Sequence, residues 1–168
     1  DPFITEAYSD NGIDYMTGDA SKAYMDDAGL KKFVRKLLYI KAANMVIVYD
    51  QIQSTLKQTH SLLFFPENQP IAESSSLITA ITDKNKIRFE NLTSGTSSMI
   101  LTTMEIEARS STDKTITPLV RIDANTSLAQ QVTAISWSKT NETPAIATLT
   151  ELNGVKIVVV EGKTYQLE

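Results

Sequence analysis

The residues most able to do chemistry lie in one stretch, Lys31–Gln53, and just after it. Asp50 ends the apolar run Met45–Tyr49, where an unpaired carboxylate would be costly to bury. It therefore needs a partner, and Arg35 on the preceding segment is the expected one. His60 is the only histidine and cysteine is absent, so a metal site built from His and Cys ligands is excluded.

These residues have both functional and structural interpretations. His60 is the one catalytic candidate, because a histidine can act as a general base near neutral pH. Its place in an apolar segment favours a hydrogen-bonded structural role instead. For Asp50, a structural ion pair or turn cap is favoured over a group at the edge of a site. No metal ligand set is expected in this chain.

A basic stripe runs along the same stretch and comprises Lys31, Lys32, Arg35, Lys36 and Lys41. Such a stripe can contact an anionic sugar or a partner domain. It can also be a solvated strand face whose charges discourage pairing at a sheet edge. Within it, Arg35 and Lys36 are substrate-binding candidates, and Tyr24 joins them as an aromatic that could stack on a sugar ring.

Other aromatic side chains could also stack on sugars, namely Tyr15, Tyr39, Tyr49 and Trp137. In a β-sandwich such side chains more often belong to the core. The sequence contains no phosphate-binding glycine loop, no serine-hydrolase motif and no zinc-protease motif. It therefore offers no self-contained active site.

Length, charge and composition limit what kind of protein this chain can be. The 168 residues predict a single domain over positions 1–168. The net charge of −4 argues against nucleic acid as a partner. No apolar run approaches the roughly 20 residues of a membrane span, and without cysteine no disulfide is possible. Because the chain begins with Asp1, we expect it to be processed or excised from a longer protein.

The central stretch is expected to be a β-hairpin with a turn at Ala42–Asn44. Its first half has apolar residues at helical spacing, so the local pattern also permits a helix. The β-branched and aromatic run Met45–Tyr49 indicates a buried strand, which needs a neighbour. The short connection supplies that neighbour, so strand is preferred for both halves.

The chain as a whole is predicted to form roughly a dozen short strands, separated by polar turns and spaced about 8–12 residues apart. This pattern predicts an all-β fold, an antiparallel two-sheet sandwich. Bends or loops are expected at Gly18–Ser21, Met25–Gly29 and Ala108–Thr117, and a helical turn is considered for Ala124–Gln131. The expected strands are Asp1–Ser9, Ile13–Met16, Thr59–Phe65, Ser76–Thr82, Lys86–Leu92, Ser98–Ile106, Leu119–Ile122, Val132–Ser138, Ala145–Leu152, Val155–Glu161 and Gly162–Leu167.

One motif resembles a known family. The segment Gly18–Tyr24, GDASKAY, is similar to the GDAT-x-AY element of the heparinase II/III-like polysaccharide lyases. In that family a basic strand with an arginine follows, then an apolar strand ending V-x-D, then a strand with a histidine. Here these are Arg35, Val48–Asp50 and His60, and the order and spacing match over Tyr15–Phe65.

The resemblance implies the C-terminal β-sandwich of a secreted or periplasmic bacterial lyase. Such enzymes carry an N-terminal α/α toroid and cleave acidic, uronic-acid polysaccharides by β-elimination. The family's catalytic tyrosine lies on the toroid, and a histidine and metal ligands precede the segment matched here. This chain would thus support the substrate cleft, be inactive alone and hold no cofactor, while the parent protein could bind a divalent metal elsewhere.

The family positions matched here are expected to be structural, and they are Gly18, Asp19, Tyr24, Arg35 and Asp50. No His-x-His precedes Tyr15, so no catalytic residue is carried over from the family. The expected partners are the toroid and an acidic polysaccharide. A stand-alone carbohydrate-binding sandwich and a purely structural interaction domain are the alternatives.

Overall fold

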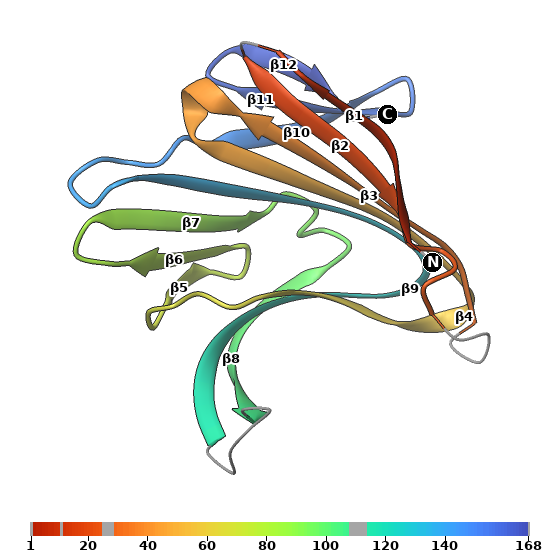
Figure 1. Cartoon of the computed structure of the whole chain (residues 1–168), viewed down its shortest axis with the longest axis horizontal. Coiled ribbons are helices and arrows are strands. Elements are labelled where there is room, and N and C mark those ends of the chain that lie inside the picture. The colour runs from red at the N-terminus through yellow and green to blue at the C-terminus, as the bar shows by residue number, and fades with distance from the viewer. Residues whose placement is uncertain (1, 11, 25–28, 108–113, 168) are drawn as a thin grey trace.

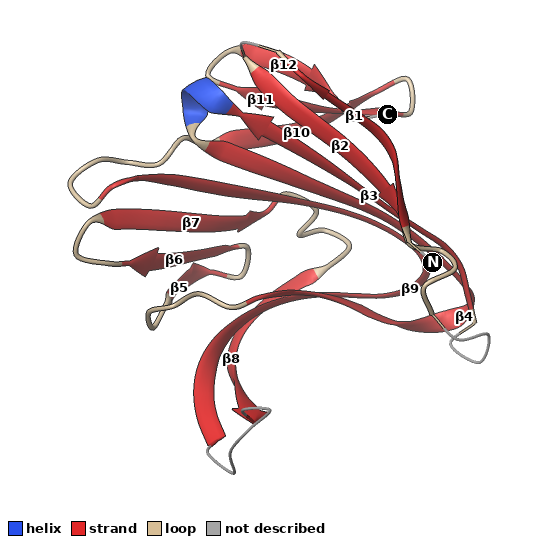
Figure 2. Cartoon of the chain, in the orientation of Figure 1, coloured by secondary structure: helices blue, strands red, loops and turns tan. Residues whose placement is uncertain are grey.

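The computed structural model describes residues 2–10, 12–24, 29–107 and 114–167 (Figure 1). These residues contain twelve strands and one short 3₁₀ helix, Lys41–Ala43 (Figure 2). The strands are β1 Phe3–Ser9, β2 Ile13–Asp19, β3 Leu30–Ile40, β4 Met45–Phe64, β5 Ile71–Ser74, β6 Leu77–Ile81, β7 Asn85–Asn91, β8 Ser98–Glu107, β9 Lys114–Lys139, β10 Ala147–Leu152, β11 Val155–Val160 and β12 Lys163–Gln166.

The strands form two antiparallel sheets, as the sequence predicted. The larger has nine strands in the order β1-β2-β3-β4-β9-β7-β6-β5, with β8 also paired to β9. The smaller has the order β10-β11-β12. In Figure 1 the large sheet is strongly twisted, and the β8–β9 hairpin projects away from the rest. The all-β, two-sheet expectation is confirmed.

The β3–β4 hairpin confirms the strand interpretation of the central stretch. The 3₁₀ turn ends at Asn44, whose φ of 45° lies in the left-handed region that asparagine tolerates. β3 pairs with β2 on one side and β4 on the other. The segment forms a strand despite its helical spacing of apolar residues, because pairing with β2 and β4 satisfies its backbone hydrogen bonds. Because β3 is an internal strand, the suggestion that its basic stripe protects a sheet edge is wrong.

Two long strands replace several short ones, which corrects the expected boundaries. The predicted strand Thr59–Phe65 is the second half of β4, which runs unbroken for 20 residues. Leu119–Ile122, the helical turn considered for 124–131, and Val132–Ser138 all belong to β9, a strand of 26 residues. Polar residues in the middle of each strand resemble loops in sequence. They are held extended because β4 and β9 pair along most of their lengths, with one register shift.

Smaller corrections concern the expected bends. Gly18 and Asp19 end β2 and are not part of a bend, so β2 is also longer than the expected Ile13–Met16. Residues 114–117 of the expected loop start β9, and residues 108–113 lie outside the described residues. Of the expected loop Met25–Gly29, only Gly29 is described. The hairpins β6–β7 and β10–β11 match their predictions closely.

The two faces of the large sheet carry separate cores. On one face the small sheet packs down through Ala147, Val158, Val160 and Leu167 onto buried residues of β3, β4 and β9. On the other face a second cluster joins β4 and β6–β9, and includes Val48, Leu62, Ile78, Phe89 and Ile122. Of the listed aromatics, Tyr49 is fully buried, whereas Tyr15, Tyr39 and Trp137 are half-buried, and Tyr39 stacks on Trp137. The candidate site lies on the second face.

Candidate functional site

The predicted Arg35–Asp50 ion pair is present. The β3–β4 register sets the two residues opposite each other. Arg35 Nε donates to Asp50 Oδ1 at 2.7 Å and Nη2 donates to Oδ2 at 2.8 Å. The Asp50 side chain is 1% exposed, whereas that of Arg35 is 38% exposed. The hydrogen-bonded carboxylate raises the pKa of Arg35, although burial acts in the opposite direction. The guanidinium is therefore fixed in place with one flank open to solvent.

Two aromatic rings stand beside this guanidinium. The Cζ of Arg35 lies 5.5 Å from the centre of the Phe33 ring, within the range of a cation–π contact. The ring centre of Tyr24 lies 6.0 Å from that of Phe33, and about half of the Tyr24 side chain is exposed. Phe33 was not among the predicted site residues. Strand alternation could have found it, because it lies two positions before Arg35 on the same face.

His60 is held by hydrogen bonds within the sheet. Its Nε2 lies 3.0 Å from the backbone oxygen of Thr126 and 3.4 Å from Oγ of Ser54. Because a carbonyl oxygen can only accept, Nε2 carries the proton and donates it. The side chain is buried, which agrees with the structural role favoured from sequence. Nε2 is thereby engaged as a donor, and the lone pair of the neutral ring lies on Nδ1.

Four of the sequence-predicted residues line a single cavity of about 370 Å³: Tyr24, Arg35, Asp50 and His60. Residues of β3 and both halves of β4 supply the rest of its lining, which comprises Leu30, Phe33, Ile52, Gln58, Thr59, Ser61, Leu62 and Leu63. We call this hollow the Arg35 cavity. It combines an ordered cation, an exposed ring and hydrogen-bonding groups, which is suited to contacting an acidic sugar.

The Gly18–Asp19 motif shapes the neighbouring corner. Asp19 Oδ1 accepts a hydrogen bond from the backbone of Ser21 at 2.8 Å, and Ser21 Oγ accepts one from the backbone of Phe33 at 2.9 Å. Hydrogen bonds from Ser21 lower the pKa of Asp19 below its ordinary value. Gly18 lies across from Arg35 in the β2–β3 register. The motif thus fixes the chain next to the Phe33 ring.

Lys36 does not join this group. Successive residues of a strand point to opposite faces, so Lys36 lies on the other side of β3 from Arg35. Its Nζ donates to the backbone oxygen of Leu167 at 2.7 Å. It lines a different cavity, of about 390 Å³, together with Tyr8, Tyr15 and Tyr165.

The described residues hold neither a metal-binding cluster nor a membrane-spanning helix. No group of three or more His, Asp or Glu side chains converges as a metal site among them. Within the same part of the chain, no helix has the length and hydropathy to cross a membrane.

Comparison with known proteins finds no matching protein-family model and no matching curated protein by sequence. Solved structures do match. The heparan sulfate lyase HepC from Pedobacter heparinus aligns with a TM-score of 0.75 at 12% identity. The heparinase III product of gene BT4657 aligns with a TM-score of 0.79 at 11% identity. Each alignment covers 99% of this chain and 27% of the other.

The chain has the fold of this heparinase III segment. A further heparinase III structure agrees, with a TM-score of 0.73 and 13% identity. At such low identity the likeness concerns the fold alone. The chain spans about a quarter of the length of these heparinase III structures, so it corresponds to one portion of a larger architecture.

Proposed function

We propose that this chain is the β-sheet portion of a secreted or periplasmic polysaccharide lyase, and that it forms one wall of a cleft for a uronic-acid polysaccharide. Cleavage by β-elimination belongs to the whole enzyme. An N-terminal α/α toroid would supply the catalytic tyrosine, and any divalent metal would be held outside this segment. The whole-chain likeness to heparinase III supports this placement.

The Arg35 cavity carries the proposed contact with substrate. A uronate carboxylate needs a cation at a defined position, and Asp50 holds the guanidinium of Arg35 there through two hydrogen bonds. The exposed Tyr24 ring offers a flat apolar surface for a pyranose. Because Asp50 neutralises much of the charge of Arg35, each contact is weak. A polymer that touches several such points is bound better than a single sugar.

Electrophoresis through gels containing alginate or heparan sulfate tests this role. We expect retardation of the chain and a clear decrease in Tyr24→Ala, because the exposed ring is removed without disturbing the Arg35–Asp50 pair. Tyr8→Ala is the matched control: Tyr8 is similarly exposed, at 48% against 53%, but lies outside the Arg35 cavity. Equal retardation of the wild-type chain and Tyr24→Ala would refute the contact.

The same preparation should be inactive as an enzyme. The proposed enzyme would hold its catalytic tyrosine on the toroid, so no unsaturated uronate should form when the chain alone meets alginate, heparan sulfate or hyaluronan. Ultraviolet absorbance of the unsaturated product measures this. Sustained product formation by the chain alone would show that it holds its own catalytic groups.

A stand-alone carbohydrate-binding module is the second candidate, and one observation favours it. Tyr8 stacks on Tyr15 with ring centres 5.2 Å apart, next to Lys36 in the cavity of about 390 Å³. An exposed ring beside a cation is a common arrangement for binding acidic sugars. In this case Tyr8→Ala would abolish gel retardation, and Tyr24→Ala would not.

A further inference from the structure

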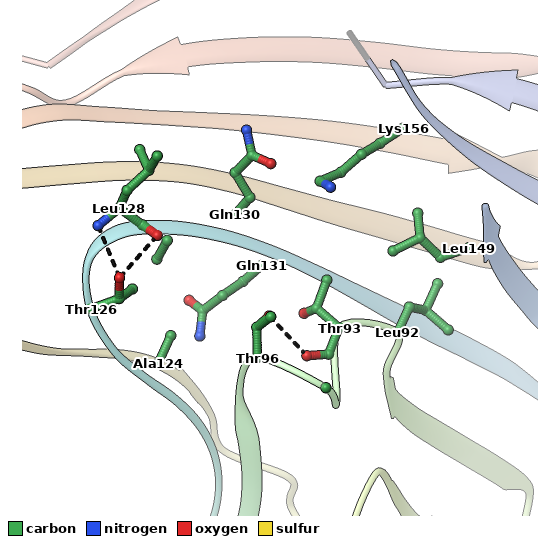
Figure 3. A pocket seen from close by; sticks show the side chains of 12 residues that line it. Leu92, Thr93, Thr96, Ala124, Thr126, Leu128, Gln130, Gln131, Leu149 and Lys156 are labelled. Carbon is green, nitrogen blue, oxygen red and sulfur yellow. Dashed lines mark hydrogen bonds between the residues drawn. The ribbon is translucent and has the colours of Figure 1, made fainter. Parts of the chain in front are cut away.

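We propose that the gap in the large sheet between β7 and β8 is a second binding site, for a hydroxylated acidic sugar residue. β9 pairs with β7 only from Thr133 onward and with β8 only up to Asp123. Between these points, residues 124–131 have β4 as their strand neighbour on one side and no described strand on the other. A hollow of about 480 Å³ opens there, which we call the β9 gap (Figure 3).

Hydrogen bonds around the turn after β7, which we call the braced turn, hold the β9 gap open without a ligand. The backbone N–H of Leu92 donates to the Val132 oxygen at 2.9 Å, and the Val132 N–H donates to Thr93 Oγ1 at 3.2 Å. The buried side chain of Asn91 accepts from the backbone and hydroxyl of Thr93 and donates to Ser97. Opposite this turn, Ala124 and Ala129 are too small to fill the space. The hollow therefore does not depend on a ligand to open it.

A buried amide oxygen lacks a partner in this hollow. Gln131 is 2% exposed, and its Nε2 donates to the backbone oxygen of Ile122 at 3.3 Å. Because that oxygen only accepts, the amide nitrogen must face it and Oε1 must face away. Oε1 has no hydrogen-bond partner among the described residues. In Figure 3 the Gln131 side chain extends into the space between Ala124 and Thr96. A buried carbonyl in this state favours any ligand that brings a donor.

A hydroxyl of the braced turn also lines the hollow. Thr96 Oγ1 donates its proton to the Thr93 oxygen at 3.2 Å, so towards a ligand this hydroxyl can only accept. Thr126 Oγ1 is already engaged in both directions, because it donates to the Leu128 oxygen and accepts from the Leu128 N–H, each at 3.2 Å. Gln131 Oε1 and Thr96 Oγ1 thus offer two acceptors, which match a ligand that carries hydroxyl groups.

One cation completes the lining. The Lys156 side chain is 12% exposed, and its Nζ lies 3.1 Å from the exposed Glu151 carboxylate. Among the described lining residues there is no acidic side chain, while Leu92, Leu128 and Leu149 supply an apolar wall. The ammonium disfavours an amine ligand and favours an acidic group. Hydroxyl donors, one carboxylate and a small apolar ring face describe a uronate-type sugar residue.

The β9 gap shares no lining residue with the Arg35 cavity. Its own hydrogen-bonding groups carry this inference, so it does not depend on the role proposed for the Arg35 cavity. Experiments can also refute the two proposed sites independently, because Tyr24→Ala should leave binding at the β9 gap unchanged.

Nuclear magnetic resonance of the ¹⁵N-labelled chain tests the site, with the Gln131 side-chain amide as the reporter. Titration with glucuronate should produce a saturable shift of this signal. Succinate carries carboxylates but no hydroxyls, and it should produce none. No saturable shift with glucuronate, as expected if the gap holds only water, would overturn the proposal. An equal response to succinate would also overturn it.

A matched pair of variants tests the contacts. Thr96→Val removes an exposed hydroxyl that donates to a backbone oxygen at the gap, and should weaken glucuronate binding about 5- to 10-fold, as for one lost hydrogen bond. Thr140→Val removes a similar exposed hydroxyl, bonded to the Thr82 oxygen at 3.0 Å, far from the gap. It should bind like the wild type. Equal binding by the two variants would refute the assignment.

Discussion

At the scale of single residues, the Arg35–Asp50 pair is unequal in burial. Asp50 is almost entirely enclosed, whereas more than a third of the Arg35 side chain reaches solvent. Removal of Arg35 leaves the buried Asp50 carboxylate without a partner. Removal of Asp50 leaves the Arg35 cation, which water can reach. A buried charge without a partner is far more costly than an exposed one. Loss of Arg35 should therefore lower the stability of the fold more than loss of Asp50.

We expect Arg35→Leu to lower the free energy of unfolding by about 3 kcal/mol, and Asp50→Leu by about half as much. The double variant should lose less than the sum of the two, because no charge is left unpaired. Urea unfolding measures all three. A larger loss in Asp50→Leu than in Arg35→Leu would contradict this account.

His60 shows how far residue type alone can guide function. A lone histidine suggests a base, but the apolar strand around it suggests a structural group. The bond from Nε2 to the Thr126 oxygen agrees with the structural interpretation. That bond joins two segments 66 residues apart, so only its apolar surroundings could be seen in the sequence.

At the scale of elements, β3 begins directly after a glycine in the left-handed region, beside β4. Gly29 has a φ of 62°, in the left-handed region that residues with a side chain rarely adopt. Its backbone oxygen accepts from the backbone of Thr55 at 2.8 Å, which ties it to β4. A Cβ at this position would lie 2.5 Å from Thr55 Oγ1. Glycine is therefore required here for two independent reasons.

Gly29→Ala is expected to destabilise the chain by about 1–2 kcal/mol, from the left-handed backbone alone. The crowding by Thr55 can only add to this. Gly95→Ala is the control, because a Cβ there meets nothing within 4 Å and no positive φ is found. Thermal unfolding of both variants decides the matter. Equal melting temperatures would show that the chain adjusts at Gly29 without cost.

Element boundaries were predictable where turns are local. The β6–β7 and β10–β11 hairpins follow from alternating side chains around short polar turns. The lengths of β4 and β9 were not predictable, because the polar residues in the middle of each strand resemble loops. They are strands because each strand supplies backbone partners for the other. That pairing joins residues far apart in sequence.

At the scale of the whole molecule, the small sheet is attached to the large one by a compact apolar contact. Val158 and Val160 of β11 are at most 1% exposed and pack with Ile47, Val132 and Ala134. A three-stranded sheet of this size depends on such a covering surface for its stability. The attachment therefore contributes to the stability of the entire chain.

Val158→Ala should lower the free energy of unfolding by about 2 kcal/mol, through lost burial and a residual cavity. Leu152→Ala removes a larger side chain from the neighbouring strand, but Leu152 is 62% exposed and should change stability little. Chemical denaturation compares the two. A larger loss in Leu152→Ala would mean that the small sheet is attached by another surface.

The all-β class, the hairpins and the pairing of Arg35 with Asp50 could be predicted from the sequence, because each depends on neighbouring strands joined by a short turn. That Tyr24 and His60 share a cavity with this pair while Lys36 lies on the other face could be seen only in the folded chain. The same holds for the place of Gln131 at an open gap of the sheet. These features depend on which distant strands meet and in what register, and side-chain direction reverses with each single residue of register.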